Sequence, residues 1–236
     1  MPKSRHSHPI LQSLLILFFL IPILSADALA ANIGTVPNWY ADEPGVYYIA
    51  NFNSNGYLYY QVVYAAGSLT EQQAVVSAAT YAENLWDNNL SEISLAKSSA
   101  NASIDVMCGH YSELVGEFPV LSGHSSDEGW TWPPDPLTTH SVTYGGSRYA
   151  VMEIDVTVER NTRIFLMVDY SETIWLKNIV AHEMGHALAW YGHNTSSNRT
   201  VMSDAYADYL ELDKTSLRTL YTSDVNHINQ IYSLVR

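Results

Sequence analysis

The feature that most constrains this chain is the stretch His182-Glu183-Met184-Gly185-His186, whose two histidines would lie one turn apart on a helix. Residues four positions apart on an α-helix lie one above the other, with Cβ atoms about 5–6 Å apart. Two imidazoles so placed can both reach one metal ion at about 2.0–2.1 Å, the usual Zn–N distance. Glu183 projects beside them, where its carboxylate can take a proton from a zinc-activated water. We therefore predict a helix that binds zinc through His182 and His186, with Glu183 as general base.

A zinc site on a helix needs a third protein ligand, and His193 is the nearest candidate. If the helix simply continued, seven further residues would carry His193 about 10 Å along the axis from His186. The chain must therefore turn back after Leu188, and Gly192 is the residue best able to allow the turn. The alternative is a chance match of the motif on an ordinary amphipathic helix.

These residues resemble the metzincin clan of zinc endopeptidases, most closely its matrixin-like members. That family reads His-Glu-x-x-His-x-x-Gly-x-x-His, which implies His182, His186 and His193 as zinc ligands and Glu183 as the catalytic base. The sequence departs from this pattern at one point. His193 comes one residue late, and Ala189 stands where the family has its turn glycine.

The resemblance also implies a fold and further site residues. It implies an α+β fold with three α/β/α layers: a twisted, mostly parallel sheet with an antiparallel edge strand, an active-site helix and a C-terminal helix. Val201-Met202-Ser203 resembles the Met-turn beneath the metal, and Tyr206 is a candidate helper for the oxyanion. In metzincins the substrate pairs with an edge strand above the cleft. The strand-like runs 149–158 and 162–169 are the candidates for that edge.

Patterns elsewhere predict individual elements. Asn55-Gly56 between two aromatic and β-branched runs, 47–52 and 57–64, favours a β-hairpin. Apolar residues at helical spacing predict helices that end near Asn88 and that begin near Thr222. Residues 109–146 show no period and are interpreted as a long irregular loop. Matrixins bind a structural zinc in the corresponding region, so His124, Asp127 and His140 are candidates for a second metal site, with a solvated loop as the alternative.

The N-terminus and the composition bear on location and partners. A basic start, an apolar run from Ile10 to Leu24 and Ala28-Leu29-Ala30 predict a signal peptide over residues 1–30, followed by one catalytic domain over 31–236. We expect a secreted, extracellular monomer. The net charge of −13 for the full sequence argues against nucleic acid or an anionic membrane as partner, leaving protein or peptide substrates. Cys108 is the single cysteine, so no internal disulfide can form.

Two other functions remain compatible with the sequence. In thermolysin-like enzymes the third ligand is a glutamate on a following helix, and Glu211 lies 25 residues after His186. A catalytically inactive secreted zinc-binding protein on the same scaffold is the other alternative, although such a protein would not need Glu183. The leading prediction is a secreted zinc-dependent endopeptidase.

Overall fold

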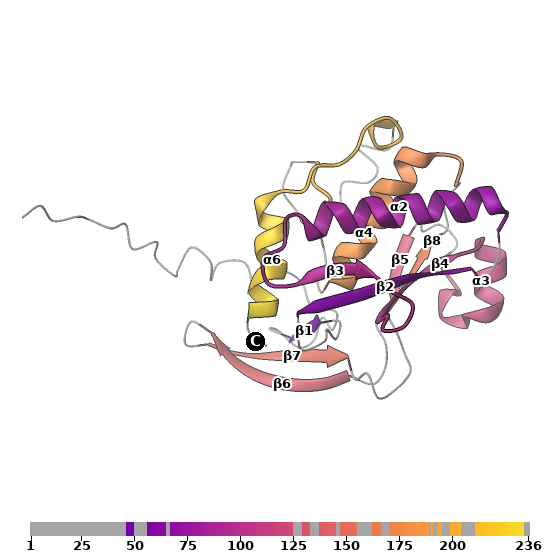
Figure 1. The fold of residues 1–236 in the computed structure, drawn as a ribbon. Coiled ribbons are helices and arrows are strands. Elements are labelled where there is room, and N and C mark those ends of the chain that lie inside the picture. Colours follow the sequence, from indigo (N-terminus) through magenta and orange to yellow (C-terminus); the bar gives the residue numbers. More distant parts are fainter. Residues whose placement is uncertain are drawn as a thin grey trace, which may run out of the picture.

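The computed structural model describes residues 46–49, 56–64, 67–124, 129–132, 137–144, 147–154, 162–166, 170–188, 190, 193–194, 199–203 and 211–233. The expected signal peptide lies outside these residues. Two sheets and several helices make up the described part of the chain (Figure 1). Within it, no helix is both long and apolar enough to span a membrane.

The larger sheet has five strands in the order β3-β2-β4-β8-β5. They span Ser94–Lys97 (β3), Tyr57–Tyr64 (β2), Ile104–Cys108 (β4), Thr162–Leu166 (β8) and Gly129–Trp132 (β5). All pairs are parallel except β5 with β8, which is antiparallel. The last three residues of β4 and of β8 are apolar and buried, as expected for central strands covered on both faces. The predicted mostly parallel sheet with an antiparallel edge strand, and with it the α+β fold class, is confirmed.

Alternate residues of the central strands face two separate cores. Val106 and Ile164 point to the core formed with α2 (Leu69–Asp87) and α4 (Thr173–Ala187). Met107 and Phe165 point to the opposite face, covered by α3 (Tyr111–Glu117) and the 3₁₀ turn η1 (Pro119–Leu121). Helix α2 begins with a capping box between Ser68 and Glu71 and ends at Asp87. The sheet therefore lies between two helical layers, and α2 and α4 cross on one of its faces (Figure 1).

The predicted hairpin across Asn55-Gly56 is wrong. β1 (Val46–Ile49) pairs in parallel with β7 (Ser147–Ile154), and β7 also pairs with β6 (Leu137–Tyr144), so these three strands form a separate sheet. β2 instead pairs with β3 and β4. Gly56 does adopt a left-handed backbone, with φ of 78°. A local turn signal was overridden by parallel pairing with strands distant in sequence.

The predicted irregular loop over 109–146 is also wrong, because α3, η1, β5 and β6 lie in it. These elements are mostly short, and a short element contains too few residues to show a helical or strand periodicity in its sequence. Neither candidate for the edge strand is an edge. β8 lies between β4 and β5, and β7 lies between β1 and β6. The edge of the larger sheet next to β8 is β5, a four-residue strand in the region interpreted as a loop.

The C-terminal helix α6 (Thr222–Ser233) begins where the sequence predicts. Its His227 is completely buried, and its ring meets the Trp190 ring at a centroid distance of 4.3 Å and an angle of 68°. Burial lowers the pKa of His227 from 6.5 to about 3. The folded chain therefore keeps this imidazole neutral far into the acid range.

We predict that His227 makes the fold sensitive to acid. The unfolded chain binds the proton near pH 6.5 and the folded chain only near pH 3. The stabilisation is therefore complete above about pH 6.5 and falls between these values by about 1.4 kcal/mol per pH unit. His227→Leu should reduce the loss of unfolding free energy between pH 8 and pH 5 by about 2 kcal/mol, measured by denaturant unfolding of zinc-loaded protein at the two pH values. An unchanged difference between the two pH values would contradict the prediction.

Candidate metal centre

Helix α4 holds the predicted motif, and almost every side chain from Trp175 to Ala187 is buried. A helix that is buried on nearly all of its faces lies within a core rather than on a surface. Trp86 of α2 fixes it there, since its indole Nε1 donates a 2.9 Å hydrogen bond to the Ala181 carbonyl. His182 and Glu183 are therefore presented by a rigid element, and each is only 5% exposed.

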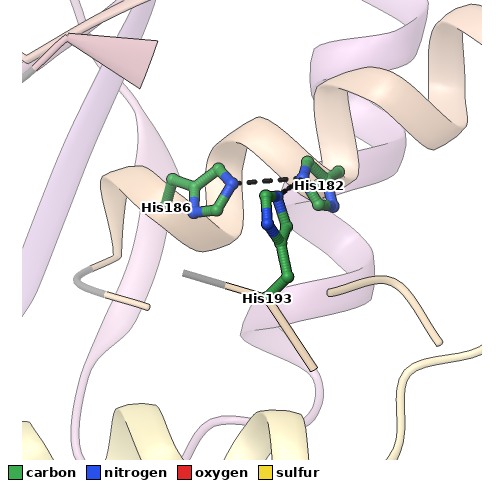
Figure 2. Close-up of side chains that lie close together, drawn as sticks. All are labelled: His182, His186 and His193. Carbon is green, nitrogen blue, oxygen red and sulfur yellow. Dashed lines mark hydrogen bonds between the residues drawn. The ribbon is translucent and has the colours of Figure 1, made fainter. Parts of the chain in front are cut away.

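Three imidazoles converge on one point at this helix (Figure 2). Nε2 of His182 lies 3.1 Å from Nε2 of His186 and 3.2 Å from Nε2 of His193. The potential ligand atoms of all three lie within 4.8 Å of one another, and among the described residues no other such group of three is found. The first two come from α4, and the third comes from the chain after the helix.

The chain turns back after the helix, as predicted. α4 ends at Ala187, and the amide of Trp190 donates to the Gly185 carbonyl at 2.9 Å. Gly192, expected at the turn, lies outside the described residues. Beyond it, the Asn194 amide donates to the Met202 carbonyl, which ties the His193 segment to residues 199–203.

Backbone carbonyls orient two of the rings. Nδ1 of His182 lies 2.7 Å from the Val201 carbonyl, and Nδ1 of His186 lies 2.8 Å from the Trp190 carbonyl. A carbonyl can only accept, so each Nδ1 carries the proton and each Nε2 presents its lone pair to the cluster. Such partners on the far nitrogen are typical of metal-binding histidines.

Burial also keeps these rings uncharged. It lowers the pKa of His182 well below its ordinary value, with further lowering by the neighbouring His186 and His193. Burial, and then His193, lower the pKa of His186 to about 3. Neutral imidazole is the form that binds a metal ion. Two Zn–N bonds of about 2.05 Å at a tetrahedral angle place their nitrogens about 3.3 Å apart. The distances of 3.1 and 3.2 Å fit zinc.

Met202 is completely buried and its side chain packs against helix α4 at Gly185. A Cβ added at Gly185 would collide with its Sδ and would lie 2.8 Å from the Trp86 ring. The glycine between the two motif histidines therefore allows Met202 to pack against the helix backbone.

A buried ion pair anchors the segment that carries Met202, and the sequence analysis did not identify it. The Arg218 guanidinium contacts the Asp213 carboxylate at 2.7 Å and donates to the Ser203 carbonyl at 3.1 Å. Asn178 of α4 joins this network, because its side chain donates to the Asp213 carbonyl at 2.9 Å and accepts from the Arg218 amide at 2.8 Å. Nothing in the local sequence signals a contact between residue 178 and residues 213–218.

We predict that this ion pair is essential to the fold. Asp213→Ala removes the carboxylate that balances the buried Arg218 charge and should lower the free energy of unfolding by about 3–5 kcal/mol. The matched control is Lys214→Ala, which removes a half-exposed pair with Glu172 at 3.5 Å. That pair should contribute less than about 1 kcal/mol. Denaturant unfolding measures both, and equal effects would contradict the prediction.

The remaining candidate residues lie elsewhere. His124 is half-buried and stacks on Trp130 with ring centroids 3.9 Å apart. Asp127 and Tyr206 lie outside the described residues, and of His140 only the backbone is described, in β6 of the smaller sheet. Glu211 is exposed, lies in the described helical residues 211–213 and is not part of the histidine cluster.

One comparison with known proteins identifies a related family. A family model described as Matrixin matches residues 51–233, which include the three histidines, Glu183 and Met202. No curated protein matches the chain. The match covers more than half of the sequence.

Proposed function

The chain belongs to the matrixin family, and on this premise we propose that it is a secreted endopeptidase that uses zinc held by His182, His186 and His193. The family itself indicates a zinc metalloprotease that acts on protein or peptide substrates. The observation that carries the proposal is the convergence of three imidazoles beside a helix that also bears a buried glutamate, with Nε2 of His182 3.1 Å from that of His186 and 3.2 Å from that of His193.

Each residue of the site has a distinct role in this proposal. His182, His186 and His193 would hold the zinc, which when bound would supply Lewis-acid chemistry, making a water more acidic and polarising the peptide carbonyl. Glu183 accepts a proton from the attacking water at its carboxylate and passes it to the departing amine. The carbonyls of Val201 and Trp190 keep the rings of His182 and His186 in the metal-binding tautomer. Met202 packs against α4 at Gly185, between the two motif histidines.

We propose β5 as the strand that aligns the substrate. It is the last strand of the larger sheet in the described part of the chain, pairing with β8 on one side. An extended peptide can add to such an edge through main-chain hydrogen bonds. Helix α4 packs against β5, so a peptide paired there would run close to the helix that bears Glu183.

Secretion remains part of the proposal. It rests on the signal-like residues 1–30, whose apolar stretch is shorter than the roughly 20 residues that a spanning helix needs. We expect the purified chain from residue 31 onward to cleave casein and a mixed peptide pool. A chelator should abolish cleavage, and added zinc should restore it. Cleavage that persists after complete metal removal would contradict the proposal, as would no cleavage by the zinc-loaded chain.

A further inference from the structure

The two faces of β5 differ in chemistry. Trp130 and Trp132 pack with Phe165 on the side of the sheet covered by α3. Gly129 and Thr131 point the other way, toward α4 and Glu183. This alternation follows from the two-residue period of a strand. The strand at the sheet edge therefore presents its small and polar residues to the glutamate of the motif.

Thr131 makes a direct hydrogen bond to that glutamate. Its Oγ1 lies 2.7 Å from Oε2 of Glu183 and 2.9 Å from the Glu183 carbonyl oxygen. Thr131 is 1% exposed and Glu183 is 5% exposed, so water can contribute little at this contact. Both of these oxygens are acceptors, so the Thr131 hydroxyl is the donor, with its single proton directed to the nearer carboxylate oxygen and the carbonyl as the longer second contact. A hydrogen bond to a buried charged group is among the stronger kinds.

Gly129 supplies the space that the same carboxylate occupies. A Cβ at this position would lie 2.8 Å from Cγ and 2.9 Å from Oε1 of Glu183, and 2.6 Å from Cγ2 of Ile179. Real Cβ atoms do not approach other atoms this closely, so any side chain here would displace the glutamate or the strand. Gly129 thus leaves room for Oε1 of the Glu183 carboxylate, and Thr131 donates a hydrogen bond to its Oε2.

We propose that Thr131 is a positioning residue for the catalytic base, with Gly129 providing the clearance. This inference rests on the proposed function. A glutamate side chain has three rotatable bonds, and the Thr131 hydroxyl restricts them to one arrangement. The same strand is proposed to align the substrate, so base and scissile bond are located by a single element. A shift of the carboxylate would therefore slow the reaction without weakening substrate binding.

The kinetic test replaces the hydroxyl by a methyl group of similar size. Thr131→Val should lower kcat by about 10- to 100-fold, the range for losing a hydrogen bond to a charged group, with KM changed less than about twofold. Thr131→Ser retains the hydroxyl and should recover most of the rate. The matched control is Thr162→Val, a buried threonine of β8 outside the stretch that pairs with β5. An unchanged kcat in Thr131→Val would overturn the proposal.

A second test does not depend on activity. In zinc-loaded protein, Thr131→Val should lower Tm by about 2–4 °C more when Glu183 is present than in the Glu183→Ala background. Equal Tm changes in the two backgrounds would overturn the proposal. If the Tm changes differ between the two backgrounds but the wild-type protein cleaves nothing, the Thr131–Glu183 contact is supported and the endopeptidase function is contradicted. The two proposals can therefore fail separately.

Discussion

Glu183→Ala is expected to lower kcat by about 10²–10⁴-fold while the protein still binds one zinc per chain. Glu183 is the one carboxylate on α4, and it follows the proposed ligand His182 directly in sequence. Without it, no positioned group accepts the proton of the attacking water. The three imidazoles are unaffected, so metal binding should survive. Steady-state cleavage of a peptide substrate and metal analysis of the same preparation measure both quantities.

Glu172→Ala is the matched control for this experiment. Glu172 lies at the start of the same helix, is partly exposed and pairs with Lys214. Its removal should leave kcat within about twofold, because surface ion pairs contribute little. If Glu183→Ala cleaved as fast as the wild type, Glu183 would not be the base. If it lost its zinc, the effect on rate would have to be attributed to the metal.

His193→Ala is expected to weaken zinc binding by more than about 100-fold and to abolish cleavage. Loss of a residue that only hydrogen-bonds to a metal ligand already costs about 10- to 100-fold in metal affinity, and loss of the ligand itself should cost more. His193 is half-buried and lies after the helix, so its truncation should leave the metal-free fold intact. Zinc titration against a competing chelator measures the affinity, and circular dichroism checks the fold.

The matched control for His193 is Glu211→Ala. Glu211 is the third ligand in the thermolysin-like alternative, but it is exposed and outside the histidine cluster. Its replacement should leave zinc affinity unchanged. The reverse pattern, with zinc lost from Glu211→Ala and retained by His193→Ala, would favour that alternative over the three-histidine site.

The motif residues could be predicted from sequence because their geometry is local. The spacing of His182 and His186 fixes their relation on any helix. The rise of a helix requires the chain to turn before His193 can approach, whichever residues form the turn. The structure confirms the turn and brings the third ring to the other two, despite the extra residue before it. Fold class followed from the same family resemblance.

Contacts between distant segments could not be predicted in this way. The Thr131 hydroxyl reaches Glu183 across 52 residues, and Asn178 meets Arg218 across 40. Neither pair leaves a periodic signal. The hairpin prediction failed for the same reason, since a turn sequence says nothing about which distant strand competes for pairing. β5 was not predicted because four residues are too few to show a two-residue period, although Trp and Thr favour strands.

The central claim is that one zinc ion is held by His182, His186 and His193. The most direct test is the crystal structure of the zinc-loaded chain, with anomalous diffraction recorded on both sides of the zinc absorption edge. We predict one strong peak at the cluster, about 2.0–2.1 Å from each Nε2. No peak there, or a peak that omits His193 and includes Glu211, would contradict the account.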